Sequence, residues 1–284
     1  MKKKIDFILK GRGKSIGEET VLQPLPHKDF RFASPFIVLH HLPNRHFNEG
    51  SPPVRVHPHP HRGFAPVTFM FKGEGFHKDT QGYSSVLKEG GVQWMFAGKG
   101  LLHSEGPTDE LLQKGGDYEF VQLWVNVPAK YKMDEPFYQE VSKEQMPSLF
   151  DEEGIDIKLA SGRYEQYTGL LKSFTPVTAA FGSVRQGKTV NFIAREGYWT
   201  LLYILEGTAL VNEQEVTEHH LVVFSKDATE ISFIAKANTR LLYLSAEPIN
   251  EPVAAKGNMV MNTPEEIEQA EMDYAAGKFG TLDF

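Results

Sequence analysis

The chain contains no cysteine among its 284 residues. This absence excludes disulfide bonds, thiol nucleophiles and thiolate metal ligands. Any bound metal ion would therefore have to be held by nitrogen and oxygen donors. Any redox chemistry would depend on that ion, because no thiol is present to be oxidised.

The sequence also lacks long apolar runs and an excess of positive charge. No run approaches the roughly 20 apolar residues that cross a bilayer. The segment Ile5 to Leu9, which follows a basic start, is too short for a signal-peptide core. We therefore expect a soluble, cytoplasmic protein with no membrane anchor.

The charge balance bears on possible partners. The chain has 30 Lys and Arg against 37 Asp and Glu, which gives a net charge of −7. This balance disfavours direct nucleic-acid binding, which needs clustered basic residues. It is compatible with a protein partner, although no sequence feature identifies one.

The apolar content, 40% of the residues, is sufficient to bury a core in two medium-sized domains. In the first half, short apolar segments alternate with glycine-bearing turns, a rhythm typical of an all-β barrel or sandwich. We predict strands at residues 35–42, 67–71, 76–79, 85–87, 92–97, 101–105 and 118–127.

The second half repeats part of this pattern. Leu202–Thr208 matches Thr68–Glu74 as a strand, a charged residue and a glycine, at an offset of 134 residues (202 − 68). The intervening stretch is charged and contains proline, which is typical of a connector. We therefore predict an N-terminal barrel, a connector and a C-terminal barrel at residues 1–130, 131–165 and 166–284.

The last domain is predicted to end in a short helix. Thr263 can cap a helix that begins at Pro264 and ends at Gly277. A mostly apolar stripe on this helix should pack on a barrel. The stripe consists of Ile267, Ala270, Glu271 and Tyr274.

Two pairs of metal-ligating residue types have the same spacing. His59 and His61 stand at i and i+2, and His103 and Glu105 repeat that spacing later in the chain. Alternate side chains of a strand point the same way, so each pair can direct both side chains at one point. Such convergent pairs have few structural uses. The spacing therefore predicts a metal site with three histidines and one carboxylate.

Other histidines offer alternative ligands. His57 continues the alternation, but three consecutive same-face positions span ~13 Å, which is too far for one ion to reach both ends. His77 and Asp79 form a rival pair, for which fixing a loop or orienting a ligand is the favoured interpretation. Isolated histidines are common in packed and surface positions, and we interpret four of them as structural: His27, His40, His41 and His46.

The second half provides no comparable ligand set. Its only histidines, His219 and His220, are adjacent and would lie on opposite faces of a strand. We therefore expect the second barrel to bind no metal. The residues 134 positions after the four predicted ligands cannot replace them, because they are Ile193, Arg195, Ala237 and Thr239.

The predicted ligands lie within longer segments that resemble the pirin family. Two further segments resemble the C-terminal signature of that family, so the resemblance covers most of the chain. The five segments are His59–Phe64, His77–Asp79, Gly91–Glu105, Glu247–Val253 and Met261–Ile267.

Two stretches depart from the family pattern. Ala65–Val67 stands where pirins usually have Glu-Thr-Val, so a carboxylate beside the site is missing. Ser34–His41 stands where the family tends to have an Asp at each end. These departures are typical of a divergent branch.

The resemblance implies two tandem cupin-type (jelly-roll) β-barrels, with one divalent ion in the N-terminal barrel. Its ligands would be His59, His61, His103 and Glu105. Fe(II) is the first choice, and Zn, Ni, Mn and Cu are alternatives. Some pirins act as quercetin 2,3-dioxygenases, which implies an oxidoreductase that takes a flavonol, or a related enol or aromatic substrate, together with dioxygen. Glu105 would be the general base.

Two other functions remain open. The ion could act as a metal or redox sensor that regulates protein partners, as in the nuclear co-regulator role of animal pirins. Alternatively, the ion could serve only to staple the barrel, because a cross-strand clamp contributes folding free energy.

Overall fold

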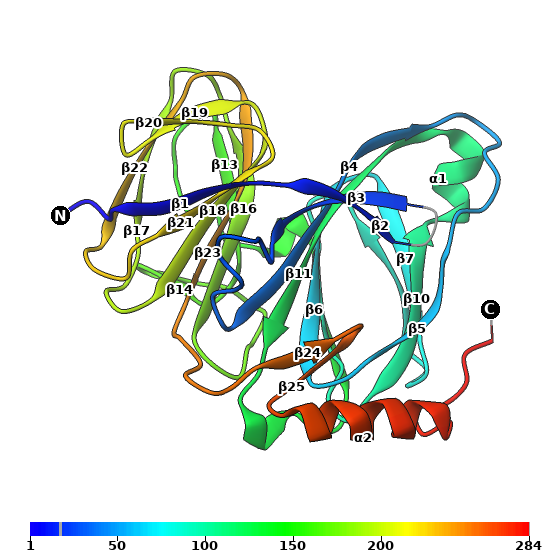
Figure 1. The fold of residues 1–284 in the computed structure, drawn as a ribbon. Helices are drawn as coiled ribbons and strands as arrows, with labels where there is room; N and C mark the ends of the chain where they lie inside the picture. Colours follow the sequence, from blue (N-terminus) through cyan, green and yellow to red (C-terminus); the bar gives the residue numbers. More distant parts are fainter. Residues whose placement is uncertain (17–18, 284) are drawn as a thin grey trace. The chain divides into compact units, whose positions relative to one another are not determined.

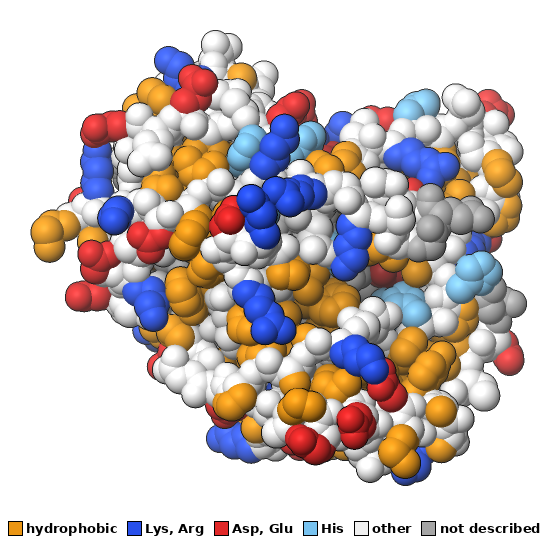
Figure 2. All heavy atoms as spheres, viewed as in Figure 1, with side chains coloured by type: hydrophobic (Ala, Val, Ile, Leu, Met, Phe, Trp, Pro, Cys, Tyr) orange, Lys and Arg blue, Asp and Glu red, His pale blue; other side chains and the backbone are white. Residues whose placement is uncertain are grey.

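The computed structural model describes residues 1–16 and 19–283. Strands dominate, with helices α1 (Asp109–Lys114) and α2 (Pro264–Ala275) and two 3-10 turns, Ala129–Tyr131 and Lys143–Gln145. The all-β class with a short C-terminal helix that the sequence predicts is confirmed. Within the described residues, neither α-helix has the length and apolar character needed to span a bilayer. Figure 2 shows acidic, basic and apolar side chains interspersed on one face.

The chain forms two compact units, and each unit is built from two separate stretches of the sequence. Unit 1 comprises Met1–His41 and Lys143–Pro248, and unit 2 comprises Leu42–Ser142 and Ile249–Phe284. The predicted limits at 1–130, 131–165 and 166–284 are continuous ranges, so they do not describe units made of two stretches each. Residues 5–10 join unit 1 by pairing with residues 220–224, whereas residues 259–279 join unit 2 by packing apolar side chains against Leu102. Both contacts are distant in the sequence.

Unit 1 contains two sheets with one shared core. Apolar side chains from both, such as Leu202 of β18 and Phe233 of β22, pack in a single cluster. The strand orders are β1-β21-β18-β23-β16-β13 and β17-β22-β19-β20, with β14-β15 as a separate hairpin. The strands are β1 (Ile5–Lys10), β13 (Ile155–Ser161), β14 (Arg163–Tyr164), β15 (Tyr167–Thr168), β16 (Val177–Val184), β17 (Thr189–Ile193), β18 (Trp199–Glu206), β19 (Thr208–Val211), β20 (Gln214–Thr217), β21 (His220–Phe224), β22 (Glu230–Ala235) and β23 (Thr239–Ala246).

Unit 2 also contains two main sheets. The smaller has the order β5-β10-β7-β8. The larger has the order β12-β9-β6-β11-β4-β3-β2, and its strands β2 and β3 and the first half of β4 belong to residues 1–41 of unit 1. Figure 1 shows the β24–β25 hairpin beside α2. The strands of these two sheets and of the hairpin are β2 (Arg12–Ile16), β3 (Glu19–Leu25), β4 (Phe36–Phe47), β5 (Val56–His61), β6 (Phe64–Lys72), β7 (Glu74–Asp79), β8 (Ser84–Lys88), β9 (Val92–Phe96), β10 (Leu101–Pro107), β11 (Gly116–Asn126), β12 (Phe137–Val141), β24 (Ala254–Lys256) and β25 (Met259–Met261).

The predicted connector contains two paired strands. β12 pairs with β9 in unit 2, and β13 pairs with β16 in unit 1. Its charged and proline-bearing composition favoured a loop. Both strands, however, lie at the end of a sheet, where one edge of a strand needs no partner and polar side chains are tolerated. Composition alone therefore did not reveal them.

Helix α2 begins as predicted. The hydroxyl of Thr263 accepts from the backbone N–H of Glu266, and the Glu266 carboxylate accepts from the backbone N–H of Thr263, which forms a complete capping box. The predicted stripe is partly wrong: Ile267 and Ala270 are buried together with Asp273, whereas Tyr274 is 43% exposed. Asp273 occupies a buried position because it pairs there with the buried guanidinium of Arg62.

A candidate metal centre

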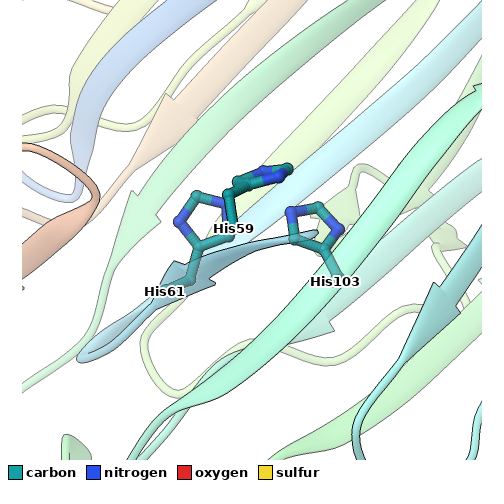
Figure 3. A group of neighbouring side chains, drawn as sticks. All are labelled: His59, His61 and His103. Carbon is teal, nitrogen blue, oxygen red and sulfur yellow. The ribbon is translucent and has the colours of Figure 1, made fainter. Parts of the chain in front are cut away.

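Strands β5 and β10 bring the predicted histidines together. The two strands pair antiparallel, with His103 opposite His59. Strand β5 lies at the edge of its sheet, where the N–H groups missing from Pro58 and Pro60 leave no gap in a ladder. Figure 3 shows the imidazoles of His59, His61 and His103 converging from these two strands.

The three imidazoles form a compact group. The ring centroid of His59 lies 4.9 Å from that of His61 and 4.2 Å from that of His103, and His61 and His103 are 4.8 Å apart. One ligand nitrogen from each ring lies within 4.8 Å of the other two. His61 and His103 are each only 1% exposed. These residues could hold a metal ion, as their spacing predicts.

Glu105 lies in a second group that overlaps the first. One of its carboxylate oxygens and one nitrogen each of His77 and His103 lie within 4.8 Å of one another. The register between β10 and β5 shifts after His103, so Glu105 pairs with Val56 there, and it pairs with His77 on β7. The structure thus places the four predicted ligands in two groups that share His103, and it adds His77.

Two imidazoles are held in a defined tautomer by backbone carbonyls. Nδ1 of His59 lies 2.8 Å from the carbonyl oxygen of His57, and Nδ1 of His61 lies 3.3 Å from that of Asn258. A carbonyl oxygen can only accept, so each Nδ1 must carry the hydrogen. The lone pair is then on Nε2, as in metal-ligating histidines whose other ring nitrogen donates to a carbonyl.

The third imidazole contacts another histidine. Nδ1 of His103 lies 3.4 Å from Nδ1 of His77, while Nε2 of His103 is buried and has no hydrogen-bond partner among the described residues. Burial, assisted by His59, His61 and His77, holds the pKa of His103 well below its ordinary value. His103 is therefore neutral at physiological pH, the form in which imidazole binds metals.

The rival pair His77 and Asp79 has two separate roles. His77 orients His103, as just described. The Asp79 carboxylate accepts from the backbone N–H groups of Gln81 at 2.8 Å and Tyr83 at 3.1 Å, which fixes the turn after β7. These contacts agree with the ligand-orienting and loop-fixing interpretations of the sequence.

The carboxylate of Glu105 is positioned by strand β11. The amide of Gln122 donates to both of its oxygens, at 3.0 and 3.2 Å. The indole N–H of Trp124 in turn donates to the amide oxygen of Gln122 at 3.3 Å, and its ring lies 5.5 Å from that of His61. Because Trp124 fixes the amide orientation, Gln122 presents N–H groups to Glu105.

Residues 249–284 support the backbone beside His61. The buried guanidinium of Arg62 donates to Asp273 of α2 at 2.8 Å and to the carbonyl of Lys99 at 2.6 Å, and the Arg62 carbonyl accepts from the N–H of Val260 at 3.1 Å. Hydrogen bonds from Lys278 and Arg62 hold the pKa of Asp273 far below its usual range. This ion pair anchors the chain immediately after a predicted ligand.

Sequence reasoning did not assign these supporting residues to the site. Gln122 and Trp124 lie in a strand that the sequence predicts, but their spacing does not relate them to the predicted ligands. A polar side chain such as Gln122, 7% exposed in an apolar strand, is the signal that could have identified it. Asn258 acts through its backbone carbonyl, which leaves no trace in residue type.

The remaining histidines have other contacts. His57 is exposed, which agrees with its exclusion as a ligand. His40 contacts Gln23 at 3.0 Å, and His41 contacts the Tyr203 hydroxyl at 2.9 Å. His27 and His46 lie 3.3 and 2.8 Å from carboxylate oxygens of Asp29 and Asp117, respectively. These contacts give the four histidines structural partners.

The interior of unit 1 is filled by apolar and aromatic side chains. Phe192 and Tyr243 stack there at 4.8 Å. His219 lies in a turn with φ of 62°, and Nδ1 of His220 lies 2.9 Å from the carbonyl of Glu218. That this barrel binds no metal stays a prediction.

Comparison with known proteins adds independent information. Residues 18–125 match the family described as Pirin, and residues 182–280 match the Pirin C-terminal cupin domain. A protein of Thermoplasma acidophilum, provisionally named a quercetin 2,3-dioxygenase, is 32% identical over 76% of this chain and 89% of its own length. Pirin-1 of Arabidopsis thaliana is 34% identical over 77% of this chain and 76% of its own.

A solved structure is similar over the whole chain. The crystal structure of quercetin 2,3-dioxygenase from Acinetobacter baumannii matches with a TM-score of 0.94 and 34% identity, covering 100% of both chains. The two tandem cupin domains that the resemblance implied are thereby confirmed. By its sequence and its fold, the chain belongs to the pirin family.

Proposed function

We propose that this protein is a metal-dependent dioxygenase of the quercetin 2,3-dioxygenase type, with Fe(II) as its ion. Its substrate would be a flavonol or a related enol-bearing aromatic molecule. The observation that carries the proposal is the convergence of three imidazoles, two of them held by carbonyls in the tautomer that ligates through Nε2. The names of the similar proteins support the substrate class.

In this proposal the ion is held by His59, His61, His103 and Glu105. Three imidazoles and one carboxylate, with no thiolate available, suit Fe(II) and also Zn, Ni, Mn or Cu. A ferrous ion with open positions would supply the site for a chelating substrate and for dioxygen. The burial of His61 and His103 keeps bulk water away from these ligands.

The protein itself would supply the proton acceptor. Glu105 would take the proton of the substrate hydroxyl, and Gln122 and Trp124 would hold its carboxylate in position for that transfer. A general base acts within ~3 Å of the proton it takes. The same carboxylate would therefore serve as ligand and base.

The test is metal analysis of protein purified without oxygen, followed by addition of quercetin and dioxygen. We expect one equivalent of iron per chain, and both atoms of labelled dioxygen in the product. Protein treated with a chelator, and then reloaded with iron, is the matched control and should lose and regain turnover.

Iron-loaded protein that turns over none of several flavonols would overturn the dioxygenase proposal. Full metal content in that sample would then favour the sensor hypothesis. Failure of the purified protein to bind any metal ion would contradict both the dioxygenase proposal and the sensor hypothesis.

A further inference from the structure

Tyr138 stands next to the candidate metal centre. It lies on β12, opposite Met95 of β9, and its ring packs on the apolar cluster that contains Met95 and Leu101. The ring lies 4.7 Å from that of His77, which is 5.0 Å from that of His103. An edge strand thus places a phenol one ring away from a predicted ligand.

The hydroxyl of Tyr138 is buried and has no hydrogen-bond partner among the described residues. Native proteins rarely leave a buried polar group unpaired, because it has lost its hydrogen bonds to water, and such a group calls for an explanation. Tyrosines of the unit 1 core behave differently: the hydroxyl of Tyr243 donates to Ile193 at 3.1 Å, and that of Tyr203 contacts His41.

The surroundings keep this hydroxyl protonated. Burial raises the pKa of Tyr138 well above its ordinary value, and the negative charges of Glu105 and Asp79 raise it further. A stacked neighbour, Tyr83, lies 4.1 Å away with the two rings inclined by 18°, which restricts rotation of the Tyr138 ring. The hydroxyl is therefore an O–H donor on a ring that its neighbours hold in place.

A cavity adjoins this phenol, and we call it the Tyr138 cavity. Its volume is about 190 Å³. A cavity of only ~10–15 Å³ can hold one water molecule, so this one has room for part of a small molecule. It is lined by Asp79, Gln81, Gly82, Tyr83, Leu101, Pro136, Phe137 and Tyr138.

We propose that Tyr138 is a ligand-binding residue, whose hydroxyl donates a hydrogen bond to a phenolate or enolate oxygen of a small aromatic molecule that reaches the metal centre through the Tyr138 cavity. An anionic oxygen gains most from an O–H donor. It also needs one here, because Glu105 and Asp79 place negative charge nearby. The inference rests on the proposed function, because the proposed metal ion would coordinate this oxygen. It adds the Tyr138 hydroxyl as a second group that binds the same oxygen.

The experiment is a titration with 4-nitrocatechol, a chelating phenol whose visible band reports its ionisation. Metal-loaded protein without oxygen is used, so that no turnover occurs. Tyr138→Phe should weaken binding roughly 10- to 100-fold. The bound probe should also need a higher pH to develop its phenolate band, a signature that a purely structural role would not produce.

The matched control is Tyr274→Phe, which removes the same hydroxyl from an exposed position on α2 and should bind the probe like the unaltered protein. Metal content should be the same in all three proteins. An unchanged affinity and band in Tyr138→Phe would overturn the inference, as would failure of the unaltered metal-loaded protein to bind the probe. Tyr138-dependent binding without flavonol turnover would instead sink only the dioxygenase proposal.

Discussion

At the scale of the residue, the three histidines of the candidate centre are each oriented by a different kind of partner. His59 uses a carbonyl two residues earlier, His61 uses the carbonyl of Asn258, 197 residues later, and His103 uses another imidazole. The strand spacing fixes where the rings can be, and these partners fix which nitrogen is presented. Only the first of these two properties could be read from the sequence.

Removal of one converging imidazole should empty the site. We expect His61→Ala or His103→Ala to lose the metal ion, because the remaining groups are too few to hold it. Elemental analysis is the measurement. His57→Ala is the matched control, since His57 belongs to the same run but is exposed, and it should retain one equivalent. Full occupancy in either site variant would show that the ligand set is wrong.

Glu105→Gln should separate the ligand and base roles of this side chain. The amide oxygen can still coordinate, so much of the metal should remain, whereas turnover should fall by roughly 10²- to 10⁴-fold, the usual contribution of a general base. Metal content and flavonol consumption are measured on the same sample. Undiminished turnover would remove the base role and leave the ligand role open.

At the scale of the element, helix α2 illustrates what a sequence pattern can and cannot predict. Its start was predictable because the Thr263 cap and the Glu266 side chain are local signals. Its inner face was not fully predictable, because burial of Asp273 depends on Arg62, which is 211 positions away. In a helical wheel, Asp273 cannot be distinguished from a charged residue on the surface.

Asp273→Ala should destabilise the protein by about 3–5 kcal/mol, because it leaves the Arg62 guanidinium buried without its partner. We also expect weaker metal retention, since Arg62 directly follows His61. Urea denaturation and metal analysis are the measurements. Glu268→Ala, at an exposed position of the same helix, should change stability by no more than ~0.5 kcal/mol. Equal effects of the two substitutions would refute a special role for the ion pair.

A buried lysine makes a second link between elements of unit 2. Nζ of Lys132 donates to the carbonyls of Gly63 and Val260 at 2.6 and 2.9 Å, and to the side chain of Asn126 at 2.6 Å. Burial lowers the pKa of Lys132 from 10.5 to about 7, while Glu251 and Glu266 act in the opposite direction. Between these two pKa values the unfolded chain binds a proton that the folded chain does not.

This difference predicts a pH dependence of stability. The free energy of unfolding should rise with pH from about 7 to about 10 relative to Lys132→Met, by at most ~1.4 kcal/mol per unit. Below pH 7 both the folded and the unfolded chain bind this proton, so the stability difference between the two proteins should become constant there. Urea denaturation of both proteins across this range is the measurement. Parallel stability curves would show that the lysine keeps its proton in the fold.

At the scale of the whole molecule, the sequence predicted the strands of the first half well, because alternation and glycine turns are local properties. It did not predict that β1 would pair with β21, with Ile5 opposite Phe224, or that residues 249–284 would join unit 2. The first depends on which sheet edge is open in space, and the second depends on which apolar side chains, such as Leu102, are available to be covered. The internal repeat predicted two barrels, but a repeat cannot show which unit the first and last segments of the chain join.

The contrast between the two barrels gives a prediction for metal stoichiometry. The double variant His219→Ala/His220→Ala should retain one metal ion per chain, because the candidate ligands all lie in unit 2. Elemental analysis of the purified variant would test it. Loss of the ion there would place a binding site in unit 1 and contradict the offset argument.

Because the carbonyl of Asn258 orients His61, the candidate metal centre can be completed only late in translation. A ribosome adds ~5–20 residues per second, so the 197 residues between these partners take roughly 10–40 s to synthesise. Late in that interval His59, His61 and His103 have all been synthesised, while the segment that supports His61 does not yet exist. The site is therefore complete only as translation ends. A truncated nascent chain stalled before Asn258 would carry every predicted ligand without the finished geometry.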